Sequence, residues 1–262
     1  MRTLAVLLIL AGVAAPALAR ADEPCPVNGL DCLAVTQFSA TADATSDAFF
    51  LTALALPVGL ELGRGLDDDS LRRGAAYASA VGGTALTAGI TKLIARRDRP
   101  YTYNQRPGVV AYTAQAKGND HSFFSGHTSI AFAALTSGAM LYNPTSRDDT
   151  ARLGIWGGAG AVAAATGVLR IRAGQHFPTD VLVGAAVGTG FGLGLTYALA
   201  PERELRGSDL GALAAGVAVG ALAAALVPMP ADVRLPLGVR DLALVPTVAP
   251  RAAGLTLSAS LR

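Results

Sequence analysis

The feature of this 262-residue chain that most constrains its fold is a series of apolar segments that contain no charged residue. Five of them are 15 to 20 residues long, enough for helices that span or nearly span a bilayer once flanking residues are added. A shorter one precedes them, and none alternates with the period of two typical of a barrel strand. The six segments are Ala48–Leu60, Ala75–Thr91, Thr128–Tyr142, Leu153–Leu169, Val181–Ala200 and Leu210–Val227. The sequence therefore predicts an all-α fold, a six-helix bundle that is transmembrane.

The composition supports this class. Hydrophobic residues make up 52% of the chain and charged residues only 15%, whereas an ordinary soluble domain has about 25% charged residues. These values argue against a disordered chain and against a charge-coated soluble protein. The net charge of +2 gives no electrostatic signature of nucleic-acid binding. We therefore expect membrane lipids as partners and no nucleic acid, and the oligomeric state stays open.

The N-terminus has the pattern of a secretory signal peptide. A basic start is followed by a short apolar run, Leu4–Ala15, and by the small-x-small sequence Ala17-Leu18-Ala19. We expect cleavage after Ala19, which removes residues 1–19; an uncleaved anchor is the alternative. Residues 20–45 then form an exported N-terminal segment. Its two cysteines, Cys25 and Cys32, are expected to form a local disulfide that staples a floppy N-terminus.

The rest of the chain divides into a helical domain, residues 46–228, and a tail, residues 229–262. In the tail, Leu242–Val248 and Leu255–Leu261 are predicted to form a short β-hairpin around Pro250–Gly254. A lone hairpin is marginally stable, so it would have to lie on the bundle. We assign no chemistry to it.

The number of segments constrains the topology. If the mature N-terminus lies outside the cytoplasm, six spans return the C-terminus to the same side. The connections Gly63–Gly74, Asn143–Arg152 and Pro201–Asp209 then face the cytoplasm. Each contains arginine, which agrees weakly with the positive-inside rule because the opposite connections are basic too.

Glycines four residues apart recur in the last two segments and predict close helix packing. The pairs are Gly184 with Gly188, Gly190 with Gly194, and Gly216 with Gly220.

Three polar clusters lie at the outer ends of these segments. The first, Lys92-x6-Arg99-Pro100, follows the second segment and by itself resembles a membrane-edge anchor. The second, Ser125-Gly126-His127, opens the third segment. Ser125 is a suitable N-cap, Gly126 permits close backbone approach, and the free N–H groups of a helix start favour an anion.

The third cluster is Arg170-x5-His176-x3-Asp180, between the fourth and fifth segments. A helix that starts near Pro178 would let Asp180 reach back to His176 and fix the tautomer of its ring. Because the segments alternate in direction, all three clusters lie on one side of the bundle. Cations around a helix start suit a phosphate, with one histidine to attack and the other to protonate the departing oxygen.

These residues resemble the signature of the type 2 phosphatidic acid phosphatases, a superfamily shared with bacterial acid phosphatases and vanadium haloperoxidases. The motif positions are Lys92-x6-Arg99-Pro100, Phe124-Ser125-Gly126-His127 and Leu169-Arg170-x5-His176-x3-Asp180. Spacing and order match over roughly residues 46–200, and three ordered motifs are far more specific than one. Phe124 stands where the motif has proline, and Leu169 stands where it has serine. Neither of these two departures removes a titrating group.

The resemblance implies that His176 is the nucleophile, that Asp180 orients it and that His127 is the general acid. It further implies a phosphate site with no metal or other cofactor. That phosphate site would be formed by Lys92, Arg99, Ser125, Gly126 and Arg170. His121, beside Asp120, is expected to be a solvated loop residue. Arg96, Arg97 and Arg172 are expected to be solvated charges; the alternative is that they shape the potential of the pocket or meet lipid headgroups.

The six-segment layout is similar to that of the bacterial lipid phosphatases of this family. It implies a phosphorylated lipid substrate and an inner-membrane protein whose active site faces the periplasm. A soluble periplasmic acid phosphatase and a vanadium-dependent haloperoxidase are the alternatives within the superfamily. A membrane scaffold with a degenerate site is the non-enzyme alternative, and the choice of lipid is not indicated by the sequence.

Overall fold

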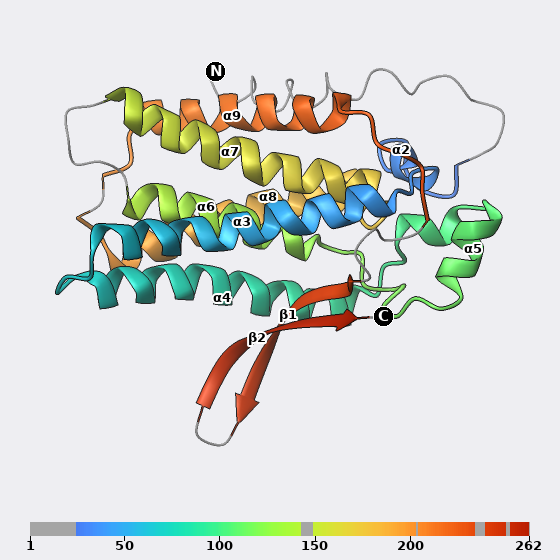
Figure 1. Cartoon of the computed structure of the whole chain (residues 1–262), viewed down its shortest axis with the longest axis horizontal. Helices are drawn as coiled ribbons and strands as arrows, with labels where there is room; N and C mark the ends of the chain where they lie inside the picture. The colour runs from blue at the N-terminus through green and yellow to red at the C-terminus, as the bar shows by residue number, and fades with distance from the viewer. Residues whose placement is uncertain (1–24, 143–148, 203, 234–238, 250–251, 262) are drawn as a thin grey trace.

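The computed structural model of the protein describes residues 25–142, 149–202, 204–233, 239–249 and 252–261. The predicted signal peptide lies outside these residues. Within them, six long helices run along a common direction (Figure 1). They are α3 (Ala40–Arg64), α4 (Ser70–Ala95), α6 (Gly126–Leu141), α7 (Asp149–Arg172), α8 (Pro178–Leu199) and α9 (Gly207–Leu226). Each predicted apolar segment falls on one of these helices.

The first helix is longer than the sequence predicts. α3 runs from Ala40 to Arg64 and continues through Pro57, so it extends beyond both ends of the predicted segment Ala48–Leu60. Ser39 caps its start by accepting a hydrogen bond from the backbone N–H of Ala42 at 3.1 Å. Pro57 packs against Gly138 of α6, where a Cβ would lie 2.6 Å from the proline ring. The extra N-terminal turns of α3 reach the end of the bundle that carries the polar clusters.

The structure supports five of the six predicted spans in the part of the chain that it describes. The stretches long and apolar enough to cross a membrane are Ala40–Arg64, Ser70–Tyr103, Asp149–Arg172, Pro178–Leu199 and Gly207–Leu226. α6 is not among them: its 16 residues extend about 24 Å. It lies in the middle of the bundle against α3, α4, α7 and α8, and all its residues except His127 are buried. Its apolar side chains therefore pack against protein rather than lipid.

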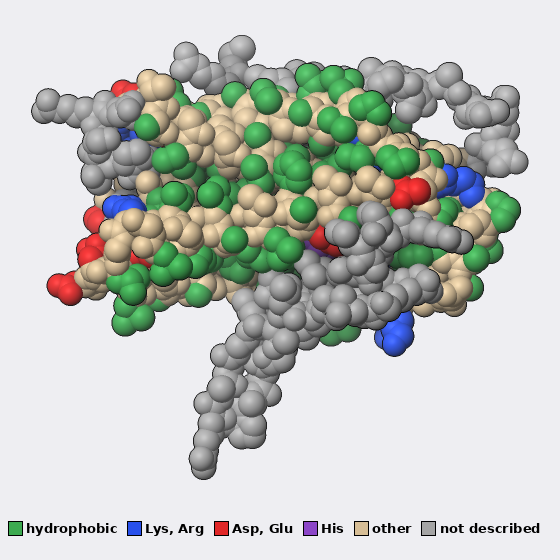
Figure 2. All heavy atoms as spheres, in the orientation of Figure 1, with side chains coloured by type: hydrophobic (Ala, Val, Ile, Leu, Met, Phe, Trp, Pro, Cys, Tyr) green, Lys and Arg blue, Asp and Glu red, His purple; other side chains and the backbone are tan. Residues whose placement is uncertain are grey.

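The surface agrees with a membrane protein. Figure 2 shows hydrophobic side chains over the sides of the helices, with acidic and basic side chains mainly towards the two ends. Exposed large hydrophobic side chains include Leu86, Leu93 and Ile94 of α4 and Val219 and Leu226 of α9. Together with the five long apolar helices, they support a membrane-embedded bundle.

Two of the three predicted glycine pairs form close helix contacts. A Cβ on Gly184 would lie 2.8 Å from the carbonyl oxygen of Ser125, so α8 packs directly on the start of α6. Gly188 continues this contact, and Gly216 and Gly220 bring α9 against the backbone of α7. The prediction is wrong for Gly190 and Gly194, because a Cβ there would meet nothing within 4 Å.

Buried ion pairs join the helices at the end away from the polar clusters. Arg73 of α4 donates to Glu61 of α3 at 2.7 Å, and both side chains are nearly inaccessible. Arg152 of α7 donates from Nε to Asp209 of α9 at 2.6 Å. Both arginines belong to the connections that the sequence assigned to the cytoplasm. Here each charge pairs with a carboxylate of a neighbouring helix, because a buried charge needs a partner.

The segments that flank the bundle are also ordered. Cys25 and Cys32 form the predicted disulfide, and Cys32 is the first residue of the short helix α2 (Cys32–Val35). This segment is packed on the protein at Asp31, whose side chain is completely buried. Two short helices, η2 (Pro100–Tyr103) and α5 (Pro107–Thr113), follow α4.

The tail begins against α3, where Asp232 accepts hydrogen bonds from Ser39 and Thr41. It continues as two antiparallel strands, β1 (Val239–Ala249) and β2 (Ala252–Leu261), paired from Val239↔Leu261 to Ala249↔Ala252. These strands are longer than the predicted ones, and β1 approaches α4.

Candidate active site

The three polar clusters meet at one end of the bundle, where α4 and α7 end and α6 and α8 begin (Figure 1). Local sequence explains both helix starts. Ser125 caps α6 by accepting a hydrogen bond from the backbone N–H of Thr128, as predicted. Pro178 is the first residue of α8, a position that proline favours. The two starts are joined, because the backbone N–H of Ser125 donates to the carbonyl of Asp180 at 3.1 Å.

Lys92, in the last turn of α4, lies beside the first residue of α6. Its Nζ would be only 3.3 Å from a Cβ on Gly126, so the absence of a side chain there makes room for the ammonium group. The first N–H groups of α6 and this ammonium group therefore point to one small region. Such an arrangement attracts an anion.

His127 is joined to the other motifs by a residue that the sequence analysis missed. Its Nε2 lies 3.0 Å from Oδ1 of Asp47 in α3, and the same oxygen lies 3.5 Å from Nη1 of Arg170. His127 is 15% exposed, while Arg170 is 6% exposed. One carboxylate thus holds the histidine of the second motif and the arginine of the third.

Arg170 and Arg99 are also held by hydrogen bonds to residues other than Asp47. Arg170 donates to Asp43 and, at 3.2 Å, to Ser46 Oγ. Arg99 donates to the side-chain carbonyl of Gln175, and its Nε donates to the backbone oxygen of Gly118 at 3.1 Å. These hydrogen bonds fix both guanidinium groups before any ligand is present, which lowers the ordering cost of binding an anion.

His176 is almost completely buried, with 1% exposure. Burial lowers the pKa of His176 well below its usual value of 6.5, and positive charges nearby lower it further. The groups that contribute to this pKa shift through their charge are Arg99, Lys92, Arg170 and His127. The ring is therefore neutral near pH 7 and has a lone pair available.

Asp180 lies beside His176 without a direct hydrogen bond to it. Nδ1 of His176 is 3.8 Å from Oδ2 of Asp180, which is too long for a hydrogen bond. Asp180 instead accepts from three donors: the backbone N–H of Phe177 at 3.0 Å, Ser122 Oγ at 2.5 Å and Arg97 Nη1 at 2.6 Å. The predicted His–Asp pair is present, but Asp180 is shared with other groups.

Comparison with known families now adds to this geometry. The family model of the PAP2 superfamily matches residues 73–204, half of the chain. The chain belongs to the PAP2 superfamily. The matched region contains every predicted site residue, from Lys92 to Asp180. PAP2 proteins are generally phosphatases, so the match supports phosphatase activity in the broad sense. No curated protein and no solved structure matches the chain.

In this PAP2 protein, all eight predicted residues gather at one end of the bundle. The sequence missed Asp43 and Asp47 because they precede the first apolar segment or lie at its edge. A signal was present, since two acids four residues apart share one face of a helix. Gln175 had no such signal.

The expectation that the remaining charged residues near the PAP2 motifs are solvated holds for one of the three residues described next. His121 is exposed and 3.6 Å from Asp120, as expected. Arg97 is not a free solvated charge, because it binds Asp31 and Asp180. Arg172 donates to the carbonyls of Ala224 and Val227 at the end of α9, so it caps a helix.

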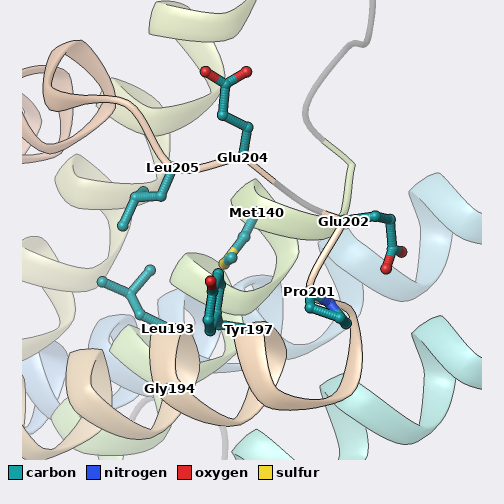
Figure 3. A pocket seen from close by; sticks show the side chains of 8 residues that line it. All are labelled: Met140, Leu193, Gly194, Tyr197, Pro201, Glu202, Glu204 and Leu205. Atoms are coloured by element: carbon teal, nitrogen blue, oxygen red, sulfur yellow. The ribbon is translucent and has the colours of Figure 1, made fainter.

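A cavity of about 590 Å³ lies elsewhere, at the opposite ends of α6 and α8. Figure 3 shows Met140, Tyr197 and Leu205 among the side chains that line it, and it contains none of the motif residues. Within the described residues, no group of three or more His, Cys, Asp or Glu side chains could hold a metal ion.

Proposed function

We propose that this PAP2 protein is a phosphatase that needs no metal and hydrolyses a phosphate monoester or pyrophosphate of a membrane lipid through a phosphohistidine intermediate. The observation that carries the proposal is a neutral, buried His176 surrounded by the charges of Lys92, Arg99 and Arg170. A neutral imidazole is a nucleophile, and fixed cations stabilise the charge on a transferring phosphoryl group.

In the first step, Nε2 of His176 attacks phosphorus, a P–N bond forms and the P–O bond to the leaving group breaks. His127 in its protonated form donates a proton to the departing oxygen from Nδ1, the ring nitrogen that Asp47 does not contact, and becomes neutral. Burial and the charge of Arg170 lower the pKa of His127 to about 4, while Asp47 raises it, and a bound phosphate would raise it further. The contact of 3.0 Å between Nε2 of His127 and Oδ1 of Asp47 would hold the ring in position for this transfer.

In the second step, water attacks the phosphohistidine. His127 takes a proton from the water, the P–N bond breaks and its electron pair returns to His176. Inorganic phosphate then leaves the cation site. Asp180 would stabilise the positive charge on the ring of His176 in both steps, through the field of its buried carboxylate.

The surface beside the site favours a lipid over a soluble ester. Lys92 is followed on α4 by Leu93 and Ile94, which are 65% and 78% exposed. Exposed aliphatic side chains next to a phosphate-binding lysine suit a substrate whose tails stay in the bilayer. With the expected signal peptide, we infer that this end of the bundle faces the periplasm and that the protein resides in the inner membrane.

A substrate panel tests the proposal. Phosphate release is measured from the detergent-solubilised protein with a chelator present. The panel contains phosphatidic acid, phosphatidylglycerophosphate, an isoprenoid pyrophosphate and a water-soluble phosphomonoester. We expect turnover of at least one lipid and a lower kcat/KM for the soluble ester. Preference for the soluble ester would favour a non-specific acid phosphatase instead.

Substitutions of the three histidines test the roles. His176→Ala should abolish turnover and the acid-labile phosphoryl label on the protein. His127→Ala should cost least with substrates whose leaving groups are already acidic, because these need little protonation. The matched control is His121→Ala, which changes an exposed histidine of the loop and should leave kcat/KM unchanged. Full activity of His176→Ala would refute the mechanism.

A further inference from the structure

A buried carboxylate outside the three motifs is connected to the reacting histidine. Asp31 belongs to the loop that the Cys25–Cys32 disulfide closes, and its side chain has no exposed surface. Arg97 Nη2 and Asn28 Nδ2 each donate to Oδ2 of Asp31 at 2.6 Å. Thr179 also donates to the Asp31 carboxylate, from its backbone N–H at 3.0 Å and from Oγ1 at 2.8 Å. This loop therefore docks on the first turn of α8, directly after His176.

Arg97 joins this carboxylate to the site. Its Nη1 donates to Asp180 Oδ1 at 2.6 Å while its Nη2 binds Asp31. The guanidinium carbon also lies 4.2 Å from the centre of the Phe177 ring, the residue after His176. A planar guanidinium with two donor edges can hold two carboxylates at once, which an ammonium group cannot do in the same geometry.

The charges of these three groups explain why the second carboxylate matters. Arg97 brings one positive charge against Asp180, which would neutralise the carboxylate beside His176 if no other anion were present. Asp31 adds a second negative charge on the other side of the guanidinium. The trio therefore has a net charge of −1, which stabilises positive charge on the ring of His176 when Nε2 bonds to phosphorus.

We propose that Asp31 is a positioning residue for phosphoryl transfer, which acts on His176 through Arg97 and Asp180. The inference rests on the proposed function for its kinetic consequences, while the connection from Asp31 to the ring of His176 can be measured without turnover. It connects the N-terminal segment, which lies outside the matched family region, to the candidate active site through Arg97.

The kinetic experiment compares Asp31→Asn with the wild-type protein on the best substrate of the panel. Asparagine keeps the size of the side chain and removes its charge. We expect kcat to fall about 10-fold, which is typical when a residue that orients a reacting group from outside the site is lost. KM should change less than about twofold. Asp31→Glu, which keeps the charge, should recover part of the loss.

The matched control is Asp98→Asn, which removes the same charge from an exposed residue next to Arg97 in the sequence. It should leave both kcat and KM unchanged. Arg97→Lys is the second variant, because it keeps the positive charge and cannot hold both carboxylates. It should lower kcat with little change in KM, and it decides the question if Asp31→Asn does not fold.

A spectroscopic measurement separates this inference from the proposed function. The chain has only three histidines, so selective ¹⁵N labelling gives three sets of ring signals. Asp31→Asn should shift the ring signals of His176 and leave those of the exposed His121 in place. A wild-type protein without turnover would refute the proposed function, and the shift of His176 would still support the connection. Unchanged His176 signals, or an unchanged kcat in Asp31→Asn and Arg97→Lys, would overturn the inference.

Discussion

Gly184 couples the packing of α8 on α6 to the geometry of the candidate active site. A Cβ at this residue would lie 2.8 Å from the carbonyl oxygen of Ser125, whereas ordinary contact begins at 3.4 Å. Gly184→Ala therefore requires the starts of α6 and α8 to separate by about 0.6 Å. The neighbouring atom belongs to the backbone, so no side chain can rotate away to relieve the contact.

The expected cost follows from what those two helix starts carry. Ser125 and Gly126 open α6, Asp180 lies in the first turn of α8, and the hydrogen bond from Ser125 N–H to the Asp180 carbonyl joins them. Catalytic groups must be held within about 0.5 Å of their productive geometry. We expect kcat/KM to fall about 10-fold, or about 1.4 kcal/mol in transition-state stabilisation. We also expect a stability loss of about 1–3 kcal/mol from overpacking.

The assay measures phosphate release and the thermal unfolding midpoint for Gly184→Ala and for a matched control, Gly190→Ala. Gly190 lies on the same helix, and a Cβ there would meet nothing within 4 Å. The control should retain the wild-type kcat/KM and Tm. If both variants behave alike, close packing of α8 on α6 does not set the site geometry, and the reasoning fails.

Three further predictions concern other parts of the molecule. Asp47→Asn should lower kcat about 10- to 100-fold, because it removes the charged partner of His127 and Arg170; an unchanged kcat would show that neither depends on Asp47. Because the pKa of His176 lies well below 6.5, the neutral nucleophile persists on acidification, and the acid-side loss of kcat, measured from about pH 4 to about pH 8, should have its midpoint below pH 6.5. A midpoint of that loss above pH 6.5 would contradict the burial of the ring. Asp209→Ala should destabilise the fold by about 3–5 kcal/mol, because it removes the buried carboxylate to which Arg152 and the backbone N–H of Arg206 donate, seen as a lower Tm.

The helices were predictable because their signal is local. A charge-free apolar segment must become a helix if it is to satisfy its backbone hydrogen bonds away from water. Helix starts followed the same logic at Ser125 and Pro178, where the capping residue and the proline act within one turn. The length of α3 was underestimated, since packing against α6 and α7 extends it beyond its apolar stretch.

The position of α6 could not be predicted in this way. Its composition resembles that of the lipid-facing helices, and only its enclosure by four neighbours shows that its apolar residues face protein. Hydropathy reports how apolar a segment is and does not report what covers it.

The spacing of the motifs was enough to predict which residues gather at one end of the bundle, His127 and His176 among them. The partners that hold these side chains became visible only in the folded protein. Arg170 meets Asp43 from 127 residues away, and Arg97 meets Asp31 from 66 residues away. The physical reason is that the sequence gives the chemical type of each titrating side chain, whereas its contacts depend on how helices that are distant along the chain pack together.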